Sequence, residues 1–97
     1  MNAVTIEVPT DLVLREQLEA FEKQVFDALK DPELESVKLD LSNTRAIDSK
    51  GVGAIIKLYR EVVFRKLFLL IVGANPNVYR VFTMTGLNKV INVEERV

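Results

Sequence analysis

The chain has 97 residues, of which 48% are hydrophobic, and this supports one small domain with a single core. It contains neither cysteine nor histidine, which excludes a disulfide framework and a thiolate metal site and removes both the commonest metal ligand and the usual general base. Thirteen basic and fourteen acidic residues give a net charge of −1 without a basic block, so the sequence indicates no nucleic-acid partner.

The first third of the chain predicts a strand and then a helix. Residues 4–8 alternate between apolar and polar side chains, as in a half-buried strand, and Pro9 ends the alternation. Either Thr10 or Asp11 is expected to cap the helix that follows, and Asp31–Pro32 is expected to end it. Apolar residues recur along this helix at steps of three and four and form one stripe over about five turns: Leu14, Leu18, Phe21, Val25 and Ala28 or Leu29.

The middle of the chain predicts a second strand and helix and then a strongly apolar strand. Residues 37–41 alternate again, and after a polar loop a helix is expected from about residue 50 to residue 65. The run 67–72 is continuously apolar, which is typical of an inner strand covered on both faces. This longest apolar run is too short to cross a bilayer, and the N-terminus lacks a signal-peptide pattern. We therefore expect a soluble cytoplasmic protein without a membrane partner.

A third helix and a short strand are predicted for the end of the chain. Asn75 is expected to cap the helix, and Pro76 suits its first position. Gly86 fits the left-handed position that follows the last turn. The last strand is expected over residues 90–93, with residues 94–97 as a tail.

Three strand–helix units and a closing strand predict one α/β domain over residues 1–97, with a mostly parallel four-stranded sheet and three principal helices. The loops that lead from strands to helices then share the carboxyl edge of the sheet, where α/β proteins place their sites. These loops are residues 10–11, 43–49 and 73–75, and the middle one is the longest and most polar.

Asp48 and Ser49 stand where the second helix is expected to begin. Both are residue types that cap helices, because a side-chain oxygen accepts a hydrogen bond from a free amide of the first turn. Ser49 is therefore either a cap and nothing more, or a helix-start residue that also presents its hydroxyl for modification. A phosphate there would add about −1.5 to −2 charges, which the helix start tolerates but which a docked partner meets as repulsion beside Asp48 and a desolvation cost.

Other chemistry has little support in the residues around this loop. A serine nucleophile needs a base, and Lys50 is expected to be exposed and protonated. Gly51 and Gly53 lack the third glycine of a dinucleotide site and instead suggest that the helix start approaches a neighbouring element closely. Asp40 and Asp48 stand at opposite ends of the connection, with no spacing that makes a metal site. We therefore predict a protein that is not an enzyme, with no catalytic residue, no metal and no cofactor.

Four segments, at residues 39–42, 47–53, 75–76 and 85–87, together resemble the STAS domain, in particular the bacterial anti-sigma factor antagonists. The likeness covers residues 37–93, and its most specific part is the Asp-Ser-x-Gly element at the helix start. Lys50 stands where the family often has a small residue, which would alter the fit to a kinase. The segments that carry the resemblance are Leu-Asp-Leu-Ser (39–42), Ile-Asp-Ser-Lys-Gly-Val-Gly (47–53), Asn-Pro (75–76) and Thr-Gly-Leu (85–87).

The resemblance implies a regulatory binding module. In that family the serine that matches Ser49 is phosphorylated by an anti-sigma factor that is also a kinase. The unphosphorylated antagonist binds this kinase and frees the sigma factor, and a phosphatase reverses the modification. We accordingly expect phosphorylation of Ser49, an anti-sigma factor serine kinase and a serine phosphatase as partners, and contacts to the partner from Asn43, Thr44, Asp48, Ser49, Lys50 and Gly51.

Two other functions stay open at this point. Some STAS modules lose phosphorylation and act as constitutive scaffolds or transporter-associated subunits, in which case Ser49 would be a cap alone. The third alternative is a small-ligand or nucleotide-binding domain that uses the carboxyl edge of the sheet.

Overall fold

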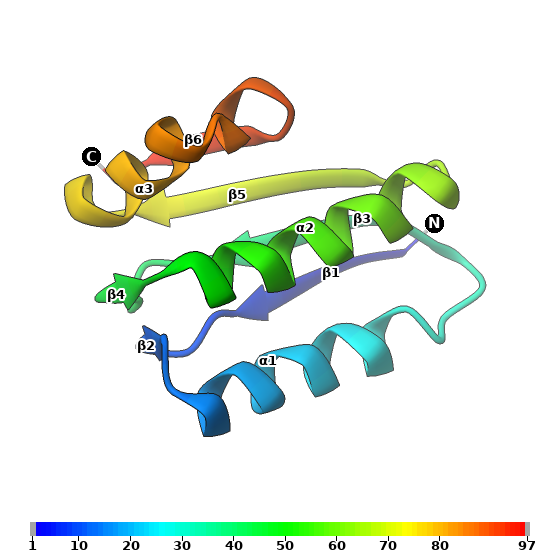
Figure 1. The fold of residues 1–97 in the computed structure, drawn as a ribbon. Coiled ribbons are helices and arrows are strands. Elements are labelled where there is room, and N and C mark those ends of the chain that lie inside the picture. Colours follow the sequence, from blue (N-terminus) through cyan, green and yellow to red (C-terminus); the bar gives the residue numbers. More distant parts are fainter. Residues whose placement is uncertain (1, 97) are drawn as a thin grey trace.

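The computed structural model describes residues 2–96 of the chain. Strands and helices alternate along these residues (Figure 1). In chain order they are β1 (Asn2–Glu7), β2 (Asp11–Leu12), α1 (Arg15–Ala28), β3 (Leu34–Asp40), β4 (Ala46–Ile47), α2 (Ser49–Phe64), β5 (Phe68–Ala74), α3 (Pro76–Thr85), the 3-10 turn η1 (Leu87–Lys89) and β6 (Asn92–Glu95).

The main sheet has four parallel strands in the order β1-β3-β5-β6. Neighbouring strands are in register through pairs such as Val4 with Val37 and Val37 with Leu69. A second, small parallel sheet joins β2 to β4, and it lies beyond the carboxyl ends of the main strands (Figure 1). The predicted fold class, a mostly parallel four-stranded sheet with three principal helices, is confirmed.

All three helices lie on one face of the main sheet (Figure 1). This follows from the strand order, because the strands are added in chain order and each right-handed crossover therefore places its helix on the same side. The other face carries the row Thr5, Lys38, Leu70 and Asn92 and has no helix over it within residues 2–96. The prediction that residues 67–72 form a strand covered on both faces is therefore wrong. In β5, Ile71 is fully buried, whereas Phe68 is 76% exposed.

The hydrophobic core fills the space between the helices and the covered face of the sheet. Each helix contributes side chains that are almost fully buried, such as Phe21 from α1, Leu58 from α2 and Phe82 from α3, and they pack against Leu39 and Ile71 of the central strands. Burial of one such side chain stabilises the fold by about 1.5–3 kcal/mol. None of the helices within residues 2–96 is long and apolar enough to cross a membrane.

The start of α1 differs from the prediction. Neither Thr10 nor Asp11 caps this helix, which begins at Arg15 after Leu14, a residue that makes no side-chain capping bond. Asp11 instead begins β2, which pairs with β4. The backbone of this segment is used to hold the central loop, since the Arg45 amide donates to the Thr10 carbonyl at 2.7 Å.

The predicted cap, first residue and end of the third helix are confirmed, and the bounds of the last strand differ from the prediction. Asn75 caps α3 by accepting a hydrogen bond from the Val78 amide at 2.8 Å, Pro76 is its first residue, and Gly86 has the expected positive φ of 76°. The last strand, however, covers Asn92–Glu95 and not residues 90–93, so residues 94 and 95 belong to the sheet and not to a tail. The predicted tail also includes residue 97, which lies outside the described residues.

Candidate functional site

The start of α2 divides two tasks between two neighbouring residues. Asp48 is the N-cap, and its carboxylate accepts hydrogen bonds from the amides of Lys50 at 3.0 Å and Gly51 at 3.2 Å. Ser49 is the first helical residue and is exposed, and its hydroxyl has no hydrogen-bond partner within residues 2–96. Of the two interpretations of Ser49, the one in which it is only a cap is therefore wrong, because Asp48 caps the helix.

The two glycines near the helix start have different surroundings. Gly51 is buried, and a Cβ atom there would lie 2.5 Å from the Leu12 carbonyl oxygen and 2.7 Å from Cγ1 of Ile47. The first turn of α2 thus lies directly against the small β2–β4 sheet, as the close-approach prediction requires. Around Gly53 a Cβ atom would meet nothing within 4 Å, so the same prediction is wrong for this residue. Gly53 stands four residues after Ser49 and shares its helix face.

Two polar residues shape the beginning of the loop between β3 and β4. The Ser42 hydroxyl and amide both donate to the Asp40 carboxylate, at 2.6 Å and 2.9 Å. These two hydrogen bonds hold the pKa of Asp40 below its ordinary value. Ser42 packs closely against Gly73, which has a φ of +78° and no room for a side chain. The turn is closed by a hydrogen bond from the Thr44 amide to the Leu41 carbonyl at 3.0 Å.

Thr44 was predicted to contact a partner, and the structure contradicts this. Its side chain is only 1% exposed, and its hydroxyl lies within hydrogen-bonding distance of the Val8 and Pro9 carbonyls, at 3.1 Å and 3.0 Å. The Thr44 carbonyl in turn accepts a hydrogen bond from the side-chain amide of Asn75 at 3.0 Å. Thr44 therefore joins three segments of the carboxyl edge inside the molecule, because a hydroxyl in this position is satisfied only by internal carbonyls.

The predicted partner-contact residues divide into a surface group and a buried group. Asn43, Ser49 and Lys50 are exposed and Asp48 is half-buried, so their side chains are accessible. Gly51, like Thr44, is buried and offers no surface to a partner. The three loops that were expected to share the carboxyl edge do so, as the bonds from Arg45 to Thr10 and from Asn75 to Thr44 show. Within residues 2–96 no group of acidic side chains could hold a metal ion.

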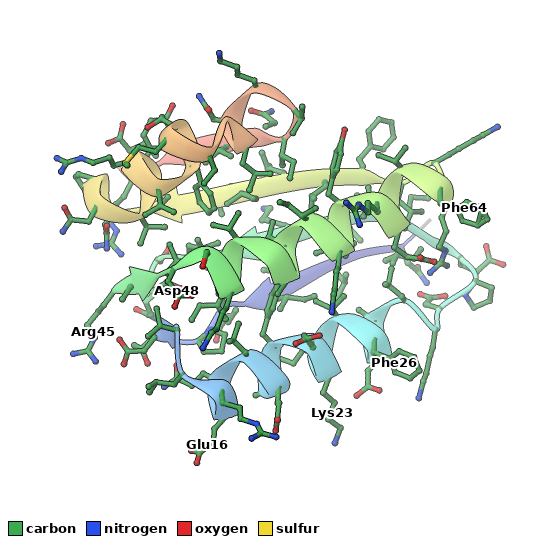
Figure 2. All side chains as sticks on the ribbon, in the orientation of Figure 1. Glu16, Lys23, Phe26, Arg45, Asp48 and Phe64 are labelled. Carbon is green, nitrogen blue, oxygen red and sulfur yellow. The ribbon has the colours of Figure 1, made fainter. Side chains whose placement is uncertain are left out.

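Arg45 is a feature of the site that the sequence analysis missed. Its guanidinium donates to the Asp11 carboxylate at 2.6 Å, and this partner raises the pKa of Arg45. The pair links β4 to β2, although the arginine side chain remains 74% exposed and points outward beside Asp48 (Figure 2). No pattern could have predicted it, because 34 residues separate the two partners. An apolar hollow of about 200 Å³ lies next to Arg45, between β4 and α3, with Ile47 and Val78 among its lining residues.

Comparison with known proteins agrees with the fold and with the sequence features. The family model of the STAS domain matches residues 9–97. A candidate anti-sigma factor antagonist of Thermotoga maritima is 27% identical over 97 residues, which cover all of this chain and 86% of that protein. The crystal structure of a candidate antagonist from the same organism superposes with a TM-score of 0.81 at 26% identity, covering 98% of this chain and 80% of that chain. The anti-sigma F factor antagonist of Paenibacillus polymyxa is 29% identical over 70 residues, or 72% of this chain and 60% of that protein. The predicted resemblance is confirmed, and the chain belongs to the STAS domain family.

Proposed function

We propose that this protein is an anti-sigma factor antagonist, a binding module that is switched by phosphorylation of Ser49 and is not itself an enzyme. The observation that carries the proposal is the division of tasks at the start of α2. Asp48 caps the helix, which leaves the neighbouring Ser49 hydroxyl exposed and without a structural hydrogen bond. The names of the relatives from Thermotoga maritima and Paenibacillus polymyxa support an anti-sigma factor as the partner.

A phosphate on Ser49 would affect docking more than folding. The start of α2 carries the positive end of the helix dipole, which stabilises an anion, while the Lys50 and Gly51 amides remain bonded to the Asp48 carboxylate. The hydroxyl gives up no internal hydrogen bond when it is modified. A docked partner surface, by contrast, would have to desolvate a doubly charged group beside the Asp48 carboxylate. The modification therefore lowers partner affinity while the fold stays intact.

Gly53 extends the proposed docking face along α2. A glycine inside a helix costs about 1 kcal/mol relative to alanine, and among the described residues none needs the space, since a Cβ would meet no atom of them within 4 Å. Ser49 and Gly53 occupy the same helix face one turn apart. A bare backbone at Gly53 lets a partner approach α2 closely next to the modified hydroxyl. The proposed contact surface is thus the side chains of Asn43, Asp48, Ser49 and Lys50 together with the backbone at Gly53.

The partners in this proposal are an anti-sigma factor with serine kinase activity and a serine phosphatase. In the kinase step the Ser49 oxygen forms a bond to the γ-phosphorus of ATP, the bond between that phosphorus and ADP breaks, and the hydroxyl proton passes to a base of the kinase. The phosphatase returns the hydroxyl by transferring the phosphoryl group to water.

The direct test is phosphosite mapping. The protein is incubated with ATP and the anti-sigma factor of its own host, and the product is mapped by mass spectrometry. We expect one phosphate on Ser49 and none in the Ser49→Ala variant. Ser42→Ala is the matched control, because Ser42 is also exposed but donates its hydroxyl hydrogen to Asp40. Labelling that persists in Ser49→Ala, or that disappears in Ser42→Ala alone, would contradict the proposal.

A second test separates a switch from a constitutive scaffold. Ser49→Asp introduces a negative charge at the modified position, and Ser49→Asn is its uncharged counterpart of similar size. We expect Ser49→Asp to bind the anti-sigma factor at least about tenfold more weakly than Ser49→Asn, which corresponds to about 1.4 kcal/mol. Both variants should melt within a few degrees of the wild type. Equal affinities would favour the scaffold alternative, in which charge at this position has no effect.

A further inference from the structure

We infer that Thr44 and Asn75 are positioning residues that hold the loop before α2 in place and thereby fix where Ser49 is presented. Any effect of these two residues on regulation rests on the proposed phosphorylation of Ser49. The physical claim concerns the loop alone: the buried Thr44 side chain and the half-buried Asn75 side chain determine the position of residues 45–48 and of the helix start that follows.

The contacts form one continuous chain across the carboxyl edge. At one end the single hydrogen of the Thr44 hydroxyl is shared between the Val8 and Pro9 carbonyls just after β1, with oxygen–oxygen distances of 3.1 Å and 3.0 Å. At the other end the Asn75 side chain, at the start of α3, donates to the Thr44 carbonyl at 3.0 Å. Ser49 follows Thr44 by five residues, and the segment between them contains β4, whose one strand partner within residues 2–96 is β2.

The small sheet by itself is a weak support for this segment. It consists of two residues on each strand, and an isolated pair of short strands is marginally stable in water. The Arg45–Asp11 ion pair adds little, because the arginine is 74% exposed and such pairs are worth about 0–1 kcal/mol. Ile47 adds apolar burial in the core, and the buried Thr44 side chain adds the polar attachment of the loop, since loss of its hydroxyl would remove the one hydrogen that the Val8 and Pro9 carbonyls share.

The identity of residue 75 supports a positioning role beyond capping. Ser, Thr, Asp and Asn all serve as N-caps, because capping requires only a side-chain oxygen. Of these four side chains, only asparagine also has an amide nitrogen that donates. Here the oxygen accepts from the Val78 amide at 2.8 Å while the nitrogen donates to Thr44, so one residue begins α3 and secures the loop.

Hydrogen exchange in the free protein tests the inference. The reporters are the amides of Arg45 and Ala46, which both donate to the Thr10 carbonyl, and the reference is the set of amides in β5. Asn75→Asp keeps the capping oxygen and loses the donor to Thr44, and Thr44→Val keeps the side-chain shape and loses the hydroxyl. In both variants we expect the reporter amides to exchange at least about fivefold faster than in the wild type, with the exchange rates of the β5 amides unchanged. Thr44→Ser retains the hydroxyl and should restore slow exchange.

Two results would overturn the inference: reporter exchange that stays at the wild-type rate, or a rise of equal size in the reporters and in β5, which would mean general destabilisation. A wild-type protein that is never phosphorylated would refute the proposed function but would leave the exchange result to decide the positioning role. In a protein that is phosphorylated, both variants should raise the KM for the kinase more than they lower kcat, because a displaced Ser49 is bound less often in the productive position.

Discussion

A pair of glycine substitutions in one helix provides the sharpest test of how the start of α2 is built. Gly51 and Gly53 are two residues apart in α2, so alanine at either position removes the same backbone freedom and adds the same methyl group. Their surroundings differ completely. The methyl group at position 51 would lie 2.5 Å from the Leu12 carbonyl oxygen, whereas at position 53 it would meet nothing within 4 Å.

The expected effects therefore have opposite signs. Replacement of a helical glycine by alanine gains about 0.5–1 kcal/mol of stability at a site where the methyl group fits, so Gly53→Ala should stabilise the protein by that amount. Gly51→Ala has the same gain but forces the helix start away from β2 and β4, and overpacking of this kind costs about 1–3 kcal/mol. The obstacles at position 51 are a backbone carbonyl and the Ile47 side chain, and the carbonyl cannot rotate out of the way. We expect a difference in unfolding free energy between the two variants of about 1–3 kcal/mol.

The assay is urea denaturation of both variants beside the wild type, with thermal melts as a second measurement. In a domain of this size, 1 kcal/mol corresponds to a change in Tm of about 4–8 °C, so the two variants should be clearly separated. Gly53→Ala should also bind the anti-sigma factor more weakly than the wild type while it folds more stably, which no loss of structure can explain. Equal stabilities of the two variants would refute the packing argument at Gly51.

Three further predictions concern the polar residues of the site. Asp48→Ala should lower the unfolding free energy by about 1 kcal/mol in urea denaturation, because the cap is lost, and Asp48→Asn should recover most of it. Ser42→Ala should raise the pKa of Asp40 toward 3.8 in a carboxyl NMR titration, whereas the pKa of Asp31, lowered chiefly by a hydrogen bond from Asn2, should not move. The pKa of Asp40 is lower in the folded protein than in the unfolded chain, so the ionised carboxylate stabilises the fold above pH 3.8. This stabilisation is lost as the pH falls through the folded pKa. The unfolding free energies of wild type and Ser42→Ala should therefore converge at the lowest pH.

The regular elements of the fold could be predicted because each has a local signal. The apolar stripe identifies α1, and Asn75, Pro76 and Gly86 mark the two ends of α3 by their own backbone and capping chemistry. The position of Ser49 at a helix start follows in the same way from Asp48. These features depend on residues within a few positions of one another, which is what a sequence pattern records.

The features that could not be predicted depend on distant contacts. β2 and β4 are two residues long and have no period to detect, and they exist because their partners are brought together by the rest of the fold. Thr44 is a polar residue in a polar loop and would be expected at the surface, yet its hydroxyl is buried against carbonyls more than 30 positions away. An apolar strand such as β5 also carries no sign of whether one face or both are covered, because that depends on the strand order of the whole sheet.

In the proposed function, Asp48 caps the helix and Ser49 carries the phosphate, so the modification would change binding without destabilising the fold. If Ser49 were the cap, its modification would change a hydrogen bond that stabilises α2, and folding and regulation would be coupled by about 1 kcal/mol. Here Asp48 accepts from the amides of both Lys50 and Gly51, so a phosphate on Ser49 would leave the cap in place. It would therefore change the free energy of partner binding far more than the free energy of unfolding. In the proposed complex the partner would have to desolvate the phosphate beside the Asp48 carboxylate, and a cost of about 1.4 kcal/mol is enough for a tenfold change in affinity. If Ser49 is phosphorylated as proposed, a single phosphate at this position would release the partner while the same core, sheet and loop remain in place.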